Sequence, residues 1–312
     1  MIRLEDMPMI LKEVEKRLNK MKNTYIKSPL NYTGGKYKLL QQIIPLLPEK
    51  IDTFVDLFGG GFTVGINVDA DHFIYNDKCK QVADLLHNFY IHDSEYIYEK
   101  VFDIINKYGL SRSDINGYQY YNTDSDKGVG AYNKQQFLEL RKFYNEEASW
   151  DKFYTLIIFA FSNQIRFNAK GEYNMPVGNR DYNIVMQKKL KIFVDKLHEK
   201  DVVFWNNDFR EKNFISNKNF VYADPPYLNS CATYNQNGAW TEKDEKDLLE
   251  LLDQINNGGG QFALSNNLKY DNPILSKWKN KYKVHYLERN YSNCNYQKKN
   301  RSKDCEVLIT NY

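Results

Sequence analysis

The sequence predicts a doubly wound α/β fold whose sheet is interrupted by a separate module. A short apolar and β-branched run at 53–58 stops at three glycines, and a second run at 72–77 ends in an acid. Apolar alternation returns only much later, at 202–205 and 219–223. A strand, a glycine turn, a helix and a second strand with a terminal acid open a doubly wound sheet, and the later strands would extend it.

The first elements follow from the spacing of apolar residues. Apolar side chains recur at helical spacing over 9–22, which predicts a helix with one apolar stripe. A second helix should follow the GGK of 34–36 and end at Pro45 and Pro48, because proline stops helices. After the second strand, the sequence KQVADLLHNFY at 80–90 predicts the next helix.

The pattern changes at about residue 91. Residues 108–135 are rich in Tyr, Asn, Ser, Asp and Gly and carry little periodicity. FYTLIIFAF at 153–161 predicts an apolar helix, and the polar, turn-rich stretch at 163–183 predicts a hairpin. We therefore expect residues 91–195 to form a mainly helical insertion that carries a β-hairpin.

The remaining chain returns to the α/β pattern. Two strands are expected at 202–205 and 219–223, followed by a strongly amphipathic helix at 242–255. A glycine turn and strand at 258–267 and a terminal strand at 305–312 complete the prediction. No internal repeat or low-complexity tract is visible.

These elements predict three parts of the chain. Residues 28–90 and 196–312 should form one sheet domain, and 91–195 the inserted domain. Residues 1–27 form an N-terminal helical extension, which could bind a partner or only aid solubility.

Composition narrows the class of protein without identifying its partner. The 312-residue chain is long enough to bury a substantial core, and its formal charge of +3 permits nucleic acid as a partner without arguing for it. It holds 25 Tyr and 18 Phe at a mean hydropathy of −0.68. Many of those rings could therefore lie near the surface and stack on bases. An AT-rich genome would also favour such a composition, and both explanations stay open.

Cysteine usage and the apolar runs bear on location. The four cysteines show no CxxC spacing and no nearby pair of histidines, so neither a metal site nor a disulfide framework is predicted. The first residues lack the apolar region of a signal peptide, and no apolar run is long enough to span a bilayer. We expect a soluble, cytoplasmic protein that does not contact membranes.

The glycine turn lies in FVDLFGGGFTVGIN at 54–67. Glycines let a ligand approach the backbone closely, but the dinucleotide fingerprint needs GxGxxG. Here Gly59 and Gly61 are followed by Gly65, and Phe62 occupies a position where a small residue would admit phosphate. The spacing favours a nucleoside without phosphates over a dinucleotide, although a glycine turn of no functional meaning is the alternative.

Two acids accompany this turn. Asp77 closes the second strand, where an acid commonly receives ribose hydroxyls. Its alternative role is a helix N-cap before residues 80–90. Asp56, at the end of the first strand, could meet an ammonium group of the ligand or could stabilise the turn, and the sequence does not separate the two.

A second acidic motif, VYADPPY at 221–227, follows an apolar strand. Asp224 should therefore emerge at the carboxyl edge of the sheet, where ligands bind in such folds. Pro225 and Pro226 lack backbone N–H groups, so they offer rigid carbonyl acceptors, and Tyr227 adds an aromatic face. Two acceptors and a ring suit a planar amine such as N6 of adenine, because they can hold its hydrogens and direct its lone pair towards an electrophile. A structural Asp-Pro-Pro turn is the alternative.

These segments together resemble the Dam-like (class α, D12) family of S-adenosylmethionine-dependent DNA adenine-N6 methyltransferases. The matching segments lie in the family's order, cover most of 28–312 and are highly specific as a set. They are SPLNYTGGKYKLL (28–40), FVDLFGGGFTVGIN (54–67), IYNDK (74–78), IRFNAKGEYNMP (165–176), NDF (207–209), ADPPY (223–227) and ALSNN (263–267). The resemblance implies a Rossmann-like methyltransferase sheet with an inserted target recognition domain.

The resemblance also implies roles for individual residues. The catalytic group would be Asp224 and Pro225, which accept hydrogen bonds from the target amine, and Tyr227, which stacks on the extruded base. The cofactor-binding residues would be Tyr32 and Lys36 at the methionine end, the turn Phe58, Gly59 and Gly61, Asp77 at the ribose, Asp208 and Phe209 at the adenine, and Asp224. The DNA-binding residues would be Arg166, Asn168, Lys170, Asn179 and Arg180.

The resemblance further implies S-adenosyl-L-methionine as cofactor and double-stranded DNA as substrate. A cognate restriction endonuclease or a second methyltransferase acting on the same site could be a partner, and we expect a monomer. The run FSNQI before Arg166, and Asn179 after Gly178, differ from the GATC-specific members, so GATC recognition is not implied. The basic KKNR at 298–301 could hold phosphates or form a solvated loop.

Three rival functions stay open at this stage. A methyltransferase acting on protein glutamine or RNA typically carries Asn-Pro-Pro-Tyr, and the Asp of this chain counts against it. An inert DNA-binding subunit would usually have lost Lys36, Asp77, Asp224 or Tyr227. A dinucleotide-dependent dehydrogenase ranks last because of the glycine spacing.

Overall fold

The computed structural model describes residues 25–32, 34–211, 216, 218–229, 240–288 and 305–312. The helix predicted at 9–22, with most of the 1–27 extension, and the KKNR segment lie outside the described residues. So do Cys231 and Cys294, whereas Cys79 and Cys305 are free thiols.

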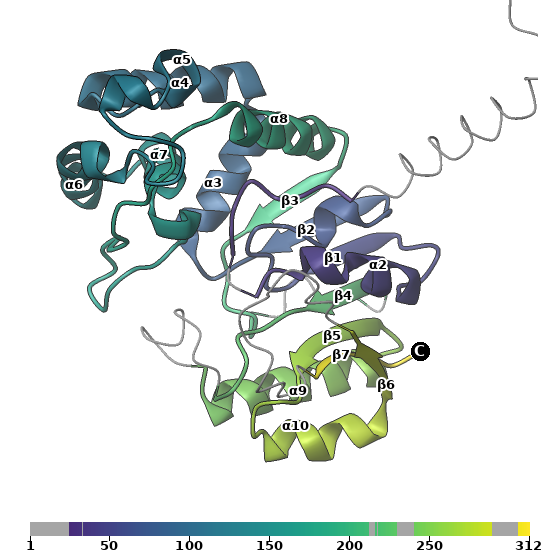
Figure 1. Ribbon diagram of the computed structural model, residues 1–312. Helices are drawn as coiled ribbons and strands as arrows, with labels where there is room; N and C mark the ends of the chain where they lie inside the picture. The colour runs from purple at the N-terminus through teal and green to yellow at the C-terminus, as the bar shows by residue number, and fades with distance from the viewer. Residues whose placement is uncertain (1–24, 33, 212–215, 217, 230–239, 289–304) are drawn as a thin grey trace, which may run out of the picture.

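A seven-stranded sheet forms the centre of the molecule (Figure 1). Its strands in spatial order are β3 (Val202–Trp205), β2 (His72–Asn76), β1 (Thr53–Asp56), β4 (Asn219–Ala223), β5 (Gln261–Asn267), β7 (Glu306–Thr310) and β6 (Lys283–Leu287). The first five run parallel, and β7 is antiparallel to both β5 and β6. The chain runs outward in one direction from β1 and in the other from β4. The predicted doubly wound sheet is thus confirmed, with its switch point between these two strands.

Alternating side chains divide the core into two layers. Phe54 of β1 and Tyr222 of β4 point to one face, where they meet α3 (Lys80–Ile91) and α8 (Ile184–His198). Val55 and Val221, each one residue away, point to the opposite face. That face is covered by α9 (Glu242–Asn257) and α10 (Pro273–Trp278). The period of two along a strand thus fills both layers of an α/β sandwich.

A group of helices lies beyond α3 and α8, on the side of the molecule away from α9 and α10 (Figure 1). It comprises α4 (Ser94–Tyr108), α5 (Ser113–Asn116), α6 (Gly130–Glu146) and α7 (Trp150–Phe159). Every residue of α7 from Phe153 to Phe159 is buried, which agrees with its nearly continuous apolar sequence. The buried side chains of this group join those of the sheet face in one continuous core. The domain boundaries at 91 and 195 therefore stay predictions.

Residues 160–183 fold back on themselves in two antiparallel bridges, Ala160 with Val177 and Phe167 with Tyr173. Arg166 and Asn174 also pair through their backbones. A turned-back segment lies where the hairpin is predicted, although its bridges are isolated and do not form a regular ladder.

Several elements differ from the sequence prediction. The helix after GGK is broken into a 3₁₀-helix η2 (Lys36–Leu39), α2 (Leu40–Ile43) and a further 3₁₀ turn η3 (Ile44–Leu46). Pro45 lies inside η3, near its start, where a missing N–H costs no hydrogen bond. Helix α6 begins inside the stretch that lacked periodicity. Its buried side includes Asn133 and Tyr144, whose polar groups interrupt the apolar periodicity in the sequence.

Among the described helices, none is both long and apolar enough to cross a membrane.

Candidate functional site

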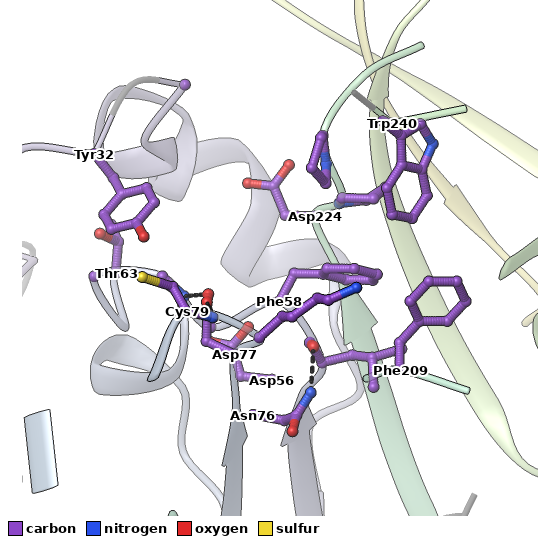
Figure 2. A pocket seen from close by; sticks show the side chains of 18 of the residues that line it. Tyr32, Asp56, Phe58, Thr63, Asn76, Asp77, Cys79, Phe209, Asp224 and Trp240 are labelled. Carbon is purple, nitrogen blue, oxygen red and sulfur yellow. Dashed lines mark hydrogen bonds between the residues drawn. The ribbon is translucent and has the colours of Figure 1, made fainter. Parts of the chain in front are cut away.

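A cavity of about 500 Å³ opens at the carboxyl edge of the parallel strands. Its lining comes from the glycine turn after β1, the ends of β2 and β4, the loop after β3 and the start of the 160–183 segment. In Figure 2, Tyr32 and Trp240 lie on opposite sides of this cavity, with Asp224 above Phe58 and Asp77 in this view. The edge of the sheet at which the sequence predicts ligand binding thus carries a cavity large enough for a small molecule.

The glycine turn forms the wall of the cavity because it is pressed against β2. The Gly59 amide donates to the Asn76 carbonyl at 2.7 Å, and the Tyr75 hydroxyl donates to the Gly60 carbonyl at 2.9 Å. A Cβ on Gly59 would lie 2.3 Å from the Tyr75 ring, and Gly60 has a φ of +47°. Both positions therefore need glycine, for space at the first and for backbone conformation at the second.

Phe62 does not face the cavity. Its ring is fully buried in the core, edge-on to Phe73 and Tyr75 at centroid distances of 6.2 and 5.6 Å. Phe62 therefore does not exclude a phosphate from the turn, contrary to the prediction; its backbone has a φ of +56°. Tyr32 instead stands beside the turn, with its ring 3.5 Å from where a Gly60 Cβ would be.

Asp77 ties the end of β2 to the glycine turn. Its carboxylate accepts from the Gly60 amide and from the Cys79 amide, each at 2.8 Å. Burial raises the pKa of Asp77, and these two hydrogen bonds partly offset the rise. The N-cap of α3 is Cys79, so the alternative role of Asp77 as a helix cap does not describe this structure.

Asp56 is buried deeper, with 2% of its surface exposed. Burial, together with the nearby charges of Asp224 and Asp77, raises its pKa to about 8, and a hydrogen bond from the Gly65 backbone partly offsets this. Asp56 thus contacts the turn and also lines the cavity, so both of its predicted roles remain open. Asp56, Asp77 and Asp224 are three of the five aspartates that line the cavity, and such a lining favours a ligand that carries positive charge.

Asp224 follows the last residue of β4 and lies in a polar cluster with Lys36 and Tyr227. The Lys36 ammonium is 2.7 Å from Asp224 Oδ1, donates to the Tyr227 hydroxyl at 2.8 Å and donates to the Gly34 carbonyl at 3.1 Å. Lys36 is only 3% exposed, whereas 22% of the Asp224 side chain remains accessible. The carboxylate is therefore held by a buried cation and still faces the cavity. The assignment of Lys36 to a cofactor carboxylate stays a prediction.

Glu306 joins this cluster from β7, and no motif in the sequence pointed to it. One of its carboxylate oxygens lies 3.2 Å from the Tyr227 hydroxyl, and the other accepts from the Asn267 amide at 3.2 Å. Tyr227 lies 79 positions away in the chain. Only the pairing of β7 with β5 brings the two together.

An aromatic wall faces the acids across the cavity. Phe58, Phe209 and Trp240 are in mutual contact, with centroid distances of 5.4 to 5.6 Å. The Trp240 indole N–H donates to Glu245 at 2.6 Å, which fixes the ring. Phe209 was predicted at a cofactor adenine, and Phe58 in the turn beneath the cofactor. Trp240 was not predicted because it does not belong to a recognisable motif. Its position just before α9 is the one signal that could have indicated it.

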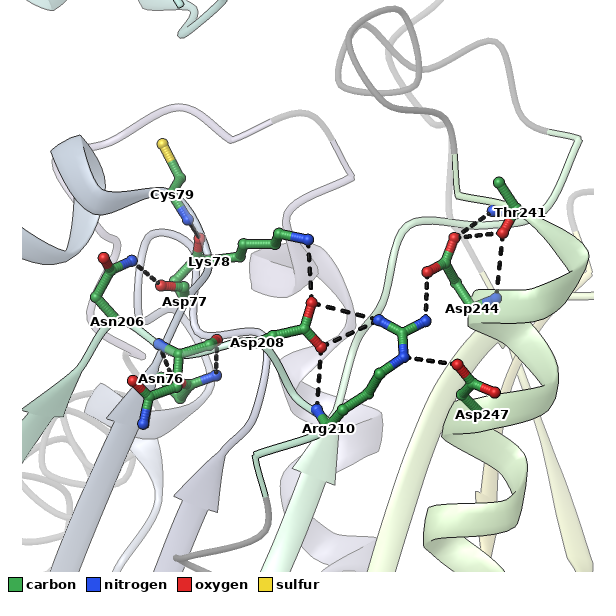
Figure 3. A network of polar contacts seen from close by, with 11 residues as sticks. Asn76, Asp77, Lys78, Cys79, Asn206, Asp208, Arg210, Thr241, Asp244 and Asp247 are labelled. Atoms are coloured by element: carbon green, nitrogen blue, oxygen red, sulfur yellow. Dashed lines mark hydrogen bonds and ion pairs between the residues drawn. The ribbon is translucent and has the colours of Figure 1, made fainter.

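Asp208 lies at the centre of a charged network at the cavity edge (Figure 3). It accepts from Lys78 and Arg210 at 3.0 Å each. Arg210 also binds Asp244 at 2.5 Å and Asp247 at 2.6 Å in the first turns of α9. Burial alone would raise the pKa of Asp244, but hydrogen bonds from Thr241 and Arg210 lower it to about 2.

The predicted DNA-binding residues fall into two groups. Arg166 lines the cavity, and its guanidinium binds the side chain and carbonyl of Asn174 at 2.7 and 2.9 Å. Asn168 shapes the tip of the segment by accepting from the backbone of Lys170 and Glu172. Lys170, Asn179 and Arg180 are exposed and away from the cavity lining. None of the five is tested as a DNA contact.

Comparison with known proteins gives a consistent result. Residues 32–293 match the family described as D12 class N6 adenine-specific DNA methyltransferase. The Type II methyltransferase M.FokI of Planomicrobium okeanokoites is 40% identical over 93% of this chain and 43% of that protein. The modification methylase StsI of Streptococcus sanguinis is 36% identical over 96% and 46%. The modification methylase LlaI of Lactococcus lactis subsp. lactis is 30% identical over 92% and 43%. The chain thus spans less than half the length of these three relatives.

Proposed function

Since this chain belongs to the family of D12 class N6 adenine-specific DNA methyltransferases, we propose that it methylates N6 of an adenine turned out of double-stranded DNA. The methyl donor would be S-adenosylmethionine. The observation that carries the proposal is the convergence of Asp224, Tyr227 and the glycine turn on one cavity. The names of the relatives, which are methyltransferases and modification methylases, agree with it.

The cavity fits this cofactor in charge and in shape. S-adenosylmethionine would supply an electrophilic methyl group on a sulfonium, and it also carries an ammonium group. Asp77 lines the cavity and is the candidate for the ribose hydroxyls. Asp56, whose pKa is raised to about 8, would lose its proton more readily once a cation rests beside it. Phe58, Phe209 and Trp240 offer a wall for the adenine ring, with Asp208 at its edge.

The chemistry assigned to the chain's own residues is hydrogen-bond acceptance at the amine. Asp224 and the carbonyl of Pro225 would accept the two N6 hydrogens, which turns the nitrogen lone pair towards the methyl group. The positive charge that develops on N6 would be stabilised by the Asp224 carboxylate, which can then take up the proton. Catalysis would rest on orientation and preset electrostatics rather than on a covalent intermediate.

The DNA must release the target base before it can reach the cavity. Flipping costs a few kcal/mol of stacking and pairing, and stacking of the base on Tyr227 would recover part of this. Arg166 lines the same cavity as Asp224, so the 160–183 segment is the candidate for the part that contacts DNA nearest the target. In this proposal the target recognition domain comprises 91–195. A restriction endonuclease or a second methyltransferase for the same site would be a partner, and the chain would act as a monomer.

The direct test is to incubate the purified protein with S-adenosylmethionine and unmethylated DNA and to sequence the product for N6-methyladenine. We expect modification at adenines within one short sequence. The matched control is Asp224→Asn, which keeps the size of the side chain and should lower the rate by 10²- to 10⁴-fold. Absence of N6-methyladenine at every site with the wild-type protein would refute the proposal, and full activity of the variant would refute the role of Asp224.

A further inference from the structure

Glu306 is a buried acid at the edge of the site to which the family's motifs assign no role. It is the first residue of β7, which runs antiparallel to β5. Because β7 runs antiparallel to β5, its first residue lies at the edge of the sheet where β5 and the other parallel strands end. Topology therefore brings Glu306 to the Asp224 edge of the sheet, although the two residues are 82 positions apart in the sequence.

Burial makes this position costly for an acid. Glu306 is 2% exposed and stands opposite Asn267 of β5 and Leu287 of β6 in the sheet register. A second carboxylate, Asp224, lies on the other side of the same tyrosine hydroxyl. Two acids that share one hydroxyl in a buried place repel each other, so an apolar residue here would be the simpler solution for stability.

The hydrogen bonds around Tyr227 indicate what Glu306 does. The Tyr227 hydroxyl accepts from Lys36 at 2.8 Å and has one proton to donate. Glu306 at 3.2 Å and Asp224 at 3.3 Å are two acceptors within its reach. Asp224 already receives Lys36 at 2.7 Å. A proton directed at Glu306 therefore leaves the lone pairs of Asp224 that Lys36 does not bind available to the cavity.

We propose that Glu306 is a positioning residue that holds the Tyr227 ring in the orientation needed for the base and keeps the tyrosine proton away from Asp224. This inference rests on the proposed methyl transfer. Asn267 fixes Glu306 in turn, because its amide donates to the second carboxylate oxygen at 3.2 Å. Asn267 thus orients Glu306, Glu306 orients Tyr227, and Tyr227 would orient the base.

Loss of the hydrogen bond between Tyr227 and Glu306 would affect the chemical step more than cofactor binding. Without an acceptor at Glu306, the Tyr227 proton turns to Asp224, which then competes with the N6 hydrogens for the same carboxylate. The ring also loses one of the contacts that set its tilt. Small errors of orientation at a reacting centre cost about 10²-fold in rate.

The kinetic test uses Glu306→Gln, Glu306→Ala and Tyr227→Phe, with Glu250→Gln on the exposed side of α9 as control. Glutamine keeps an acceptor oxygen, so kcat should stay within about threefold of wild type, as it should in the control. Alanine should lower kcat by roughly tenfold to a hundredfold while the cofactor Kd stays unchanged. In a Tyr227→Phe background the alanine change should cost almost nothing further, because the hydroxyl that it served is gone.

Three kinetic results would overturn the proposal. They are wild-type kcat in Glu306→Ala, an equal loss in the Tyr227 and Tyr227→Phe backgrounds, and a loss in Glu306→Gln as large as in Glu306→Ala. The last would mean that charge, and not the hydrogen bond, is required. Should Glu306→Ala fail to fold, Glu306→Leu, which fills the same space without an acceptor, takes its place in both the Tyr227 and Tyr227→Phe backgrounds.

A spectroscopic measurement separates this inference from the proposed function. A single 3-fluorotyrosine at position 227 reports the ring environment by ¹⁹F NMR in the protein without DNA. Its resonance should be nearly the same in Glu306→Gln as in wild type, and shifted or redistributed in Glu306→Ala. That result would stand even if the wild-type protein methylated no DNA. An unchanged resonance in Glu306→Ala would overturn the positioning role whatever the activity.

Discussion

Three of the carboxylates that line the cavity, those of Asp56, Asp77 and Asp224, have different kinds of partner. Asp224 pairs with the buried Lys36 ammonium, and Asp77 accepts from two backbone amides. Asp56 receives the Gly65 amide and forms no ion pair with the residues that the structure describes, and burial raises its pKa to about 8. Because burial raises its pKa, Asp56 keeps its proton to a higher pH than an ordinary aspartate does.

The raised pKa of Asp56 predicts a specific dependence of stability on pH. The unfolded chain releases the Asp56 proton near pH 4, while the folded protein keeps it up to about pH 8. The folded state binds the extra proton between these values, so the contribution of Asp56 to stability falls as pH rises from 4 to 8. Asp56→Asn lacks this proton.

The measurement is urea unfolding of wild type and Asp56→Asn, without cofactor, at intervals from pH 4.5 to 8.5. We expect the wild type to lose on the order of a few kcal/mol relative to the variant over this range and the difference to level off above pH 8. Parallel curves for the two proteins would show that Asp56 has an ordinary pKa.

At this scale the sequence was informative where a role depends on local order. Asp224, Pro225 and Tyr227 are consecutive or nearly so, and Asp77 follows directly from its strand, so their common cavity could be expected. Glu306 could not be found in this way, because its contact with Tyr227 depends on the pairing of β7 with β5. Phe62 was misplaced because the sequence does not reveal a positive φ at a non-glycine residue.

At the scale of elements, Arg210 connects the loop after β3 to the start of α9. One guanidinium holds Asp208 on one side and Asp244 and Asp247 on the other. Because Trp240 directly precedes α9 and is fixed by Glu245 of that helix, the same element sets both the edge and the wall of the aromatic pocket. The position of α9 therefore determines the shape of this side of the cavity.

Arg210→Ala should loosen this connection. The four side chains are partly exposed, at 26 to 34%, so solvent screens the pairs and the loss of stability should be modest, with Tm lower by about 2–4 °C. The Kd for S-adenosylmethionine should rise about tenfold, as measured by calorimetry, because Asp208 is no longer oriented. Lys246→Ala, which removes an exposed pair with Glu242 on the same helix, is the control. A Kd equal to wild type would contradict the role given to Arg210.

The elements that could be predicted are those with a clear period or a clear stop. The strands β1, β2, β4 and β5 and the helix α9 have them, and all were expected. The strand β6 was not, because it is an edge strand with Lys283 and Tyr286 exposed and little apolar alternation. Helix α6 was not predicted because its surface is polar and because one of its buried residues is the polar Asn133. Two hydrogen bonds with Ser111 satisfy this buried side chain.

At the scale of the whole molecule, the 160–183 segment joins the helical group to the cavity. Arg166 lines the cavity, whereas Lys170 and Arg180 are exposed. If DNA lies along this segment, the two exposed cations would meet phosphates and Arg166 would lie nearer the target base. Continuous packing of the helical group against the sheet, in one core, would hold this arrangement rigid.

The salt dependence of DNA binding tests this arrangement. Each phosphate contact adds about 0.9 to the slope of log K against log salt. The double variant Lys170→Ala, Arg180→Ala should therefore lower the magnitude of the slope by about 2 on any DNA sequence, as measured by fluorescence anisotropy. Lys246→Ala should leave the slope unchanged. An unaltered slope in the double variant would place the phosphates elsewhere.

We propose that Asp224 and Tyr227 act on a base that has left the duplex. The most direct measurement of this claim is the fluorescence of a duplex that carries 2-aminopurine at the modified adenine, once sequencing has located that adenine. Binding of the wild-type protein should raise the fluorescence severalfold because the base becomes unstacked. Tyr227→Ala should bind the duplex but give a clearly different signal, because the stacking surface is lost. A duplex that binds tightly without any change in fluorescence, or an identical signal in the two proteins, would contradict the claim.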